Sequence, residues 1–344
     1  MTALSVPLSL SVPRGVFRGW AAALAMVLGA LVALPATAAP GKAPPERAEV
    51  IMIGDRLVNV AYHLGVVPRA LSIRGDVWPF GRTLAKTTSI IMGCPGYIAK
   101  RDPEMVPRIL RETGVKRILI EHSPEFDRLK PQRDPMTVIP VLEASGVLED
   151  LGVTVEIVDF GEGIDAAITR VGALLDRADK AEALIHRRTS ALDRANNGLP
   201  LTEAGGSVVI LNGVYQSATG KGFVRVELPG GYADTFLLEP LGLTNAGGAF
   251  VEAGAKAQHG FATVRTLDLL KTISPDALVL TGDADAVQRA LIKAMARDPA
   301  LADIPAIARG AVVTLPAYVD SNVIEYPTVL QRWSVTLAAA LAAR

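Results

Sequence analysis

Short apolar runs alternate with amphipathic segments through two successive parts of the chain. Such runs predict strands buried on both faces, and their alternation with helical segments predicts parallel sheets covered by helices. Strands are expected at 50–53, 89–91, 117–120 and 154–158 in the first part, with a further apolar run at 70–73, and at 208–211, 277–280 and 311–314 in the second. Helices are expected at 59–64, 103–112, 138–151, 235–241, 267–271, 286–296 and 327–343.

One longer segment joins the two parts. Residues 162–197 contain no proline, and apolar residues from Ile164 to Leu192 recur there in steps of three, four or seven. This pattern predicts one amphipathic helix of roughly 36 residues, about 50 Å long. A rod of that length would hold a cleft at nearly fixed width, which is typical of a binding protein. The predicted fold is therefore two doubly wound α/β lobes, residues 49–161 and 198–344, joined by one long backbone helix with a ligand cleft between them.

The beginning of the chain resembles an export signal. Arg14 and Arg18 precede an apolar stretch over 20–32, and Ala36-Thr37-Ala38 has the small residues of a cleavage site. Residues 1–38 are predicted to be a cleaved signal peptide and 39–48 a disordered lead-in. The mature protein is then expected to be soluble in the periplasm.

The composition and the missing motifs argue against several classes of function for this protein. The chain has 35 basic and 35 acidic residues and no basic stripe with interleaved aromatics, so nucleic acid is not expected as a partner. A single cysteine, Cys94, excludes an internal disulfide. The glycine-rich patterns of phosphate and dinucleotide loops and the nucleophile elbow are missing, which predicts a non-enzyme without a catalytic cofactor. A periplasmic chelatase-like enzyme stays open as an alternative, because such two-lobed folds also carry catalysis.

Four stretches carry a family resemblance: 53–66, 102–120, 180–185 and 274–312. In order and spacing the chain resembles the class III (cluster A) periplasmic substrate-binding proteins of ABC importers, which include vitamin B12-, siderophore-, haem- and metal-binding members. The resemblance implies a monomer that captures a metal chelate (a siderophore, haem or corrinoid) and delivers it to an inner-membrane permease dimer with its ATPase. It also implies permease docking through Glu104 and Asp268, each at the start of the equivalent helix in its lobe.

Candidate ligand-binding residues follow from the carboxyl ends of the predicted strands, where ligands bind in open α/β sheets. Several of the chain's few aromatic residues fall there, which favours a flat, partly apolar ligand, and the arginines would pair its carboxylates or phenolates. Arg225 is expected on a glycine-rich loop that covers the cleft. The candidates are Arg74, Trp78, Phe80, Cys94, Tyr97, His122, Tyr215, Arg225 and Tyr318.

A metal site is the alternative interpretation. Cys94 follows one predicted strand, and Glu121 and His122 end another that is taken as its neighbour. Thiolate, carboxylate and imidazole together would bind a transition metal, or the metal of a chelate axially. A binder of a free transition metal or of an oxyanion is therefore kept beside the chelate hypothesis.

Overall fold

The computed structural model describes residues 45–75, 78–84, 90–123, 134–197, 205–216 and 219–342. The predicted signal peptide and most of the predicted lead-in lie outside these residues. The lead-in prediction is wrong for 46–48, because strand β1 already begins at Glu46 and Ala48 pairs with Pro68 of the next strand. None of the helices in the described ranges combines the length and the apolar character that a membrane span needs.

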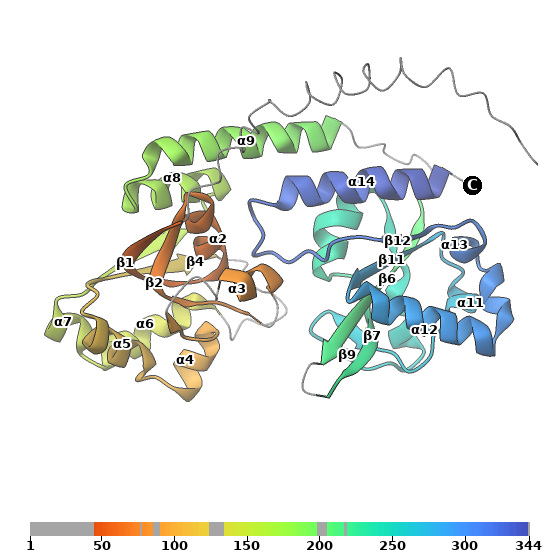
Figure 1. The fold of residues 1–344 in the computed structure, drawn as a ribbon, viewed down its shortest axis with the longest axis horizontal. Coiled ribbons are helices and arrows are strands. Elements are labelled where there is room, and N and C mark those ends of the chain that lie inside the picture. The colour runs from red at the N-terminus through yellow and green to blue at the C-terminus, as the bar shows by residue number, and fades with distance from the viewer. Residues whose placement is uncertain are drawn as a thin grey trace, which may run out of the picture. The chain divides into compact units, whose positions relative to one another are not determined.

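The first lobe is built on a parallel sheet of five strands in the order β3-β2-β1-β4-β5 (Figure 1). The predicted strands are confirmed as elements, and the run at 70–73 overlaps β2. Their bounds are β1 (Glu46–Ile53), β2 (Val66–Ser72), β3 (Ile90–Ile91), β4 (Arg117–His122) and β5 (Thr154–Asp159). The helical segments between them are α2 (Asp55–His63), α3 (Pro79–Leu84), α4 (Pro95–Arg101), α5 (Met105–Thr113), η2 (Pro135–Val138), α6 (Ile139–Ala144) and α7 (Val147–Leu151).

Both faces of this sheet are buried, as continuous apolar strands require. Successive side chains of a strand point to opposite faces, so Val50 and Met52 of β1 enter one core while Ile51 and Ile53 enter the other. The first core is closed by α2 and α8 (Ile164–Leu174), and the second by α4, α5, α6 and α7. Because all five strands are parallel, their carboxyl ends lie along one common edge of the sheet.

The second lobe has a mixed sheet in the order β12-β11-β6-β7-β10-β9, with β8 beside β6. Strand β12 pairs parallel with β11, and β11 and β8 pair parallel with β6, whereas β7 pairs antiparallel with both β6 and β10. The strands are β6 (Ser207–Gln216), β7 (Lys221–Glu227), β8 (Thr244–Asn245), β9 (Ala257–Gln258), β10 (Phe261–Thr263), β11 (Ala277–Gly282) and β12 (Val312–Thr314). The prediction of a glycine-rich loop around Arg225 is wrong, because this residue lies inside β7.

Helices again cover both faces of the second sheet. Val208 and Ile210 of β6 face α14 and the segment of η3 and η4, and Val209 and Leu211 face α11, α12 and α13. The elements are η3 (Asp234–Leu238), η4 (Glu239–Leu241), η5 (Ala246–Gly248), α10 (Ala249–Glu252), α11 (Leu270–Ile273), α12 (Ala284–Arg297), η6 (Pro299–Asp303), α13 (Pro305–Ala308) and α14 (Tyr326–Ala342).

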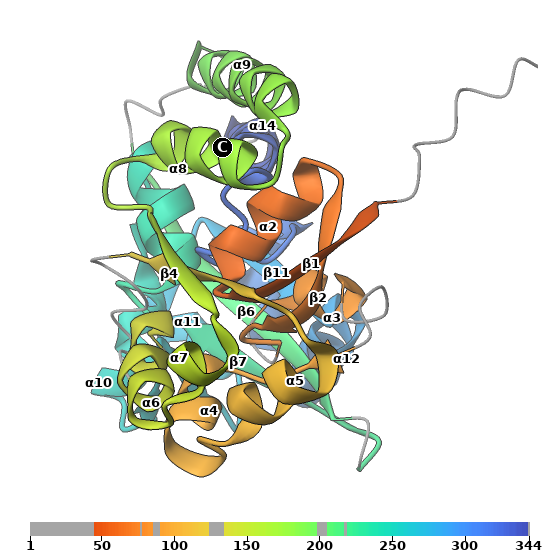
Figure 2. The same ribbon diagram turned by 90° about the vertical axis from the view of Figure 1, so that its left-hand side faces the viewer.

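The single helix predicted over 162–197 is wrong. The segment forms α8 and α9 (Ala178–Asn197), two packed helices that fold back as a hairpin (Figures 1 and 2). The chain turns at Asp176, whose φ of 55° is left-handed, and the Arg177 N–H donates to the Gly172 carbonyl at 2.7 Å. A Cβ on Gly172 would stand 2.5 Å from the Cβ of Ala181, so glycine lets the two helices approach this closely.

The spine between the lobes is therefore α9 alone, 20 residues and about 30 Å long. Its first half contributes Ala181 and Leu184 to a core of the first lobe, and its end contributes Ala195 to a core of the second. Helix α14 packs beside it (Figure 1).

A second connection joins the lobes. We call residues 318–325 the strap, because this segment leaves the second lobe after β12 and returns to it as α14. Tyr318 is buried in a core of the second lobe, whereas Val319 and Val323 are buried in the first-lobe core that contains α2. The two lobes thus share a core segment in addition to α9.

Candidate functional site

Charged side chains gather where β1 and β2 end. Asp55 begins α2 directly after β1, and Arg74 follows β2. The Arg74 backbone N–H donates to Asp55 Oδ1 at 2.8 Å, and its Nε donates to Oδ2 at 2.6 Å. Both side chains are buried, Arg74 fully. Because ionised groups away from water need partners, this pair is a structural element of the lobe.

The strap completes the arrangement from the other side. Arg74 Nη2 donates to Asp320 Oδ1 at 2.8 Å and to Ser321 Oγ at 2.9 Å, and Ser321 Oγ donates to Asp55 Oδ2 at 2.8 Å. Arg74 therefore bridges two buried carboxylates that lie 265 positions apart in the sequence, from Asp55 to Asp320. This set of contacts leaves Arg74 without a face for a ligand, and we do not propose it as a ligand-binding residue.

Glu121 of β4 extends the same network. Its Oε2 accepts the backbone N–H groups of Arg56 and Leu57, at 2.8 and 3.3 Å, at the start of α2. Gly54 makes this approach possible, since a Cβ there would lie 2.3 Å from the Cβ of Glu121. Burial is the main cause that raises the pKa of Glu121 to about 7, against the opposing effect of Arg56.

Two predicted aromatic ligand contacts are core residues instead. Trp78 is fully buried, and its indole N–H donates to Asn322 Oδ1 of the strap at 2.6 Å. Phe80 lies edge-on to Trp78 at the border of the same core and is only partly buried. Tyr318 packs between Phe236 and Tyr326, and burial raises its pKa. Trp78 and Tyr318 thus hold the strap in place.

The remaining candidates reach solvent near the carboxyl ends of strands. Tyr97 on α4 is 48% exposed and Tyr215 near the end of β6 is 58% exposed. His122 at the end of β4 is partly buried, with Nδ1 3.2 Å from Asp159 Oδ2. The Gly161 backbone N–H, and then His122, hold the pKa of Asp159 below its usual range. These residues present one imidazole and two phenol rings.

The structure does not bring the predicted metal ligands together. Cys94 follows β3, and Glu121 and His122 belong to β4, but β2 and β1 stand between these strands. Three strand spacings correspond to about 14 Å, far beyond the reach of one metal ion. Over the described part of the chain, no group of three or more His, Cys, Asp or Glu residues could hold a metal. The prediction that these two strands are neighbours is wrong.

Arg225 is the cation best placed to meet a ligand. It lies opposite Asn212 in the antiparallel pair of β7 and β6, and its Nη2 donates to Asn212 Oδ1 at 2.7 Å. Asn212 in turn donates from Nδ2 to Thr281 Oγ1 at 2.9 Å, one residue before the end of β11. The guanidinium stacks on Phe261 at 4.0 Å. Partial burial lowers the pKa of Arg225, but a guanidinium remains charged in proteins.

None of the described carboxylates lies within ion-pair distance of Arg225. A half-buried, oriented cation beside an aromatic face is suited to binding a carboxylate or phenolate of a planar ligand. Arg225 is predicted from the sequence, and Asn212 also falls at a predicted strand end, but Thr281 and Phe261 were missed. The alternating buried Val224 and Val226 are the signal that would have placed Arg225 on a strand.

The two predicted docking residues lie on the surface at corresponding places. Glu104 directly precedes α5, which leads into β4, and is 63% exposed beside Arg111. Asp268 is exposed in the turn before α11, which leads into β11. Helix α11 has only four residues, so Asp268 does not begin a regular helix as expected.

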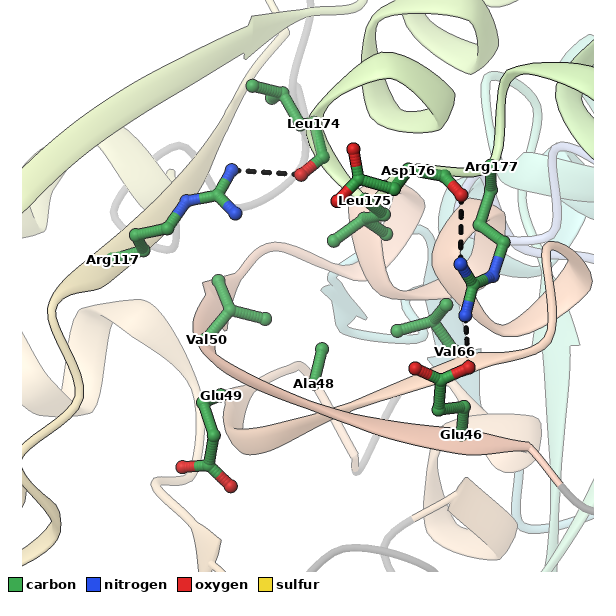
Figure 3. A pocket seen from close by; sticks show the side chains of 10 residues that line it. All are labelled: Glu46, Ala48, Glu49, Val50, Val66, Arg117, Leu174, Leu175, Asp176 and Arg177. Carbon is green, nitrogen blue, oxygen red and sulfur yellow. Dashed lines mark hydrogen bonds and ion pairs between the residues drawn. The ribbon is translucent and has the colours of Figure 1, made fainter.

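A pocket of about 160 Å³ lies at the opposite, amino-terminal ends of β1 and β4 (Figure 3). Both of its arginines are engaged: Arg177 pairs with Glu46, and Arg117 donates to the Leu174 carbonyl at 2.9 Å. Ligands of open α/β sheets bind at the carboxyl ends of the strands. This pocket is therefore not the candidate site.

Residues 147–319 match the model of a family described as periplasmic binding protein. No curated protein sequence matches the chain. Among solved structures, the periplasmic heme-binding protein BhuT, in complex with two hemes, is 21% identical with a TM-score of 0.54, over 86% of this chain and 98% of that one.

Two further structures share the fold. The periplasmic heme-binding protein RhuT from Roseiflexus sp. RS-1, in apo form, is 16% identical with a TM-score of 0.52, over 86% of this chain and 99% of that one. The iron-uptake system-binding protein FeuA from Bacillus subtilis is 14% identical with a TM-score of 0.52, over 84% and 94%. At these identities the likeness concerns the fold alone.

Proposed function

Because this chain belongs to the periplasmic binding protein family, in the class III group of ABC-importer proteins, we propose that it captures a metal chelate such as a siderophore, haem or corrinoid. The ligand would bind between the carboxyl ends of the two sheets and be delivered to a permease dimer with its ATPase in the inner membrane. In this proposal the protein is not an enzyme, and the chelate is its cargo.

One observation carries the choice of ligand class: Arg225 is charged, half-buried and stacked on Phe261, and no carboxylate of the described residues lies within ion-pair distance of it. A large aromatic or catecholate chelate with peripheral acids matches a cation beside a ring. The exposed Tyr97 and Tyr215 add aromatic surface from both lobes. BhuT and RhuT, which are described as heme-binding, and FeuA, described as part of an iron-uptake system, support the same class.

The free-metal alternative finds no support, since its three donors are not gathered at one place. The other alternative, a small oxyanion as the cargo, would use the same guanidinium of Arg225. It would be recognised by a bound ion without visible absorption and without an organic component.

Substituting Arg225 tests the proposed ligand contact. A hydrogen bond to a charged group contributes about 1.5–3 kcal/mol, so Arg225→Gln should weaken binding about 10- to 150-fold. The measurement is a titration of the purified protein with haemin, a ferric tris-catecholate and cobalamin, followed by visible absorption or tryptophan fluorescence. Arg309→Gln, an exposed arginine before β12, is the matched control and should leave the affinity unchanged. Equal affinities for both variants would remove Arg225 from the site.

Charge reversal tests the proposed permease contact separately. The double variant Glu104→Lys with Asp268→Lys should abolish uptake in cells, while the affinity of the purified protein for its ligand stays unchanged. Glu112→Lys with Asp303→Lys alters two other exposed acidic residues, one in each lobe, and should transport normally. A loss of ligand affinity in the first variant, or a loss of transport in both, would contradict the docking assignment.

A further inference from the structure

The strap meets the first lobe through a compact set of ionisable groups. Three carboxyl groups, of Asp55, Glu121 and Asp320, surround two guanidinium groups, of Arg56 and Arg74. With every group ionised, the cluster carries one more negative charge than positive. The excess lies in a buried region, where an unbalanced charge is costly.

We propose that the strap, residues 318–325, is a proton-controlled latch between the two lobes, and that Glu121 is the group that takes up the controlling proton. When Glu121 is neutral, the cluster is balanced and the strap is held firmly. When Glu121 is ionised, the hold on Asp320 weakens and the strap opens more often.

The geometry of Arg56 explains the link. Its Nε lies 3.9 Å from Glu121 Oε1 and donates to the Asp320 carbonyl at 3.1 Å, while Nη2 lies 3.3 Å from Asp320 Oδ2. The Arg56 guanidinium thus lies beside two carboxyl groups, that of Glu121 on the first lobe and that of Asp320 on the strap. An ionised Glu121 competes with Asp320 for the Arg56 guanidinium and repels the Asp320 carboxylate, whereas a protonated Glu121 does neither.

The contacts of Glu121 accommodate both states. Ser123 Oγ lies 3.0 Å from Glu121 Oε1 and donates to it when it is ionised. A protonated Glu121 can donate to the same hydroxyl, because a serine oxygen both donates and accepts. The two backbone N–H groups of α2 remain bonded to Oε2 throughout. A raised pKa near neutrality places the exchange in the range of ordinary periplasmic conditions.

Other charged or titratable groups contact the strap, and the test must separate them. His63 Nε2 lies 2.8 Å from Glu325 Oε1 at the far end of the strap, and Asn59 donates to the same carboxylate. Arg188 on α9 donates to the Val323 carbonyl at 3.2 Å and keeps its charge. Tyr318 stays neutral, since its pKa is raised by burial. The imidazole of His63 therefore contacts the strap at its other end, and the test must separate its effect from that of Glu121.

Hydrogen–deuterium exchange of the full chain at pH 6, 7 and 8 measures the opening of the strap. After correction for the intrinsic exchange rate, peptides covering 318–325 should open up to about tenfold more often at pH 8 than at pH 6 in the natural protein. Glu121→Gln mimics the protonated state and should give slow, pH-independent opening. His63→Gln should keep the pH dependence.

Glu227→Gln is the matched control, because Glu227 is a buried glutamate of similar raised pKa in the second lobe, bonded to the Ala233 N–H and outside the strap. It should leave the opening of the strap as in the natural protein. Opening that is equal at all three pH values in the natural protein would overturn the proposal, and this result does not depend on any variant folding. A pH dependence that survives Glu121→Gln but disappears in His63→Gln would also overturn it.

Discussion

Asp320→Asn should lower the free energy of unfolding of the first lobe by about 3–5 kcal/mol, the usual effect of breaking a buried ion pair by removing one partner. Arg74 is fully buried and Asp320 is 4% exposed, so water cannot replace the lost carboxylate. Arg56 loses its Oδ2 partner in the same substitution. Chemical denaturation followed by circular dichroism and by Trp78 fluorescence measures the change.

Asp102→Asn is the matched control for this prediction. It breaks a pair of similar length, 2.9 Å to Arg108, but one that lies at the surface. Exposed pairs contribute about 0–1 kcal/mol, so the two variants should differ several-fold in their effect. Equal, small effects would show that the strap does not hold the first lobe together.

Stability should also fall as the pH rises from about 4.5 to 7. Burial is the main cause that raises the pKa of Glu121 and of Glu227 from 4.5 to about 7. Between these values the folded state keeps a proton on each carboxyl that the unfolded chain has released, so a rising pH favours unfolding. Over two and a half pH units, each group accounts for about 3 kcal/mol, and the dependence levels off above pH 7.

Denaturation midpoints at intervals from pH 4.5 to 8 test this sign. Glu121→Gln and Glu227→Gln should each remove about half of the fall, and the double variant should be nearly flat. Carboxyl groups with a lowered pKa, such as Glu325 beside His63, make the stability rise with pH, and they do so below this pH window. A stability that rises through the window in the natural protein would contradict the assignment.

The positions of β1 to β6, β11 and β12 were predictable because each contains a short apolar run, whereas β7, β8, β9 and β10 lack such a run and were not predicted. The break in the predicted long helix could not be predicted from the sequence, because the turn at 175–177 contains neither proline nor glycine. A left-handed Asp176 closes it, and the small residues Gly172 and Ala181 let α8 and α9 pack back to back. A hairpin of two amphipathic helices has the same apolar periodicity as one long helix. The family model matches residues 147–319, so the family assignment stands although the long helix is broken.

Part of the candidate site was predictable from the strand ends, and part was not. Tyr97 and Tyr215 were named because they follow predicted strands, whereas Arg225 was named for a glycine-rich loop that is in fact strand β7. The structural roles of Arg74 and Trp78 depend on Asp320 and Asn322, about 245 positions away, and no local pattern reports such contacts. Strand order is equally nonlocal, which is why Cys94 and His122 were placed together although two strands separate them.

The proposed chelate cargo is tested most directly by native mass spectrometry, with visible absorption, of the protein released from the periplasm of cells grown with and without metal restriction. The account predicts an added mass that contains both a metal and an organic component, in a coloured complex that Arg225→Gln binds more weakly. Protein that carries a bare metal ion or a small oxyanion instead, in stoichiometric amount and without colour, would contradict it.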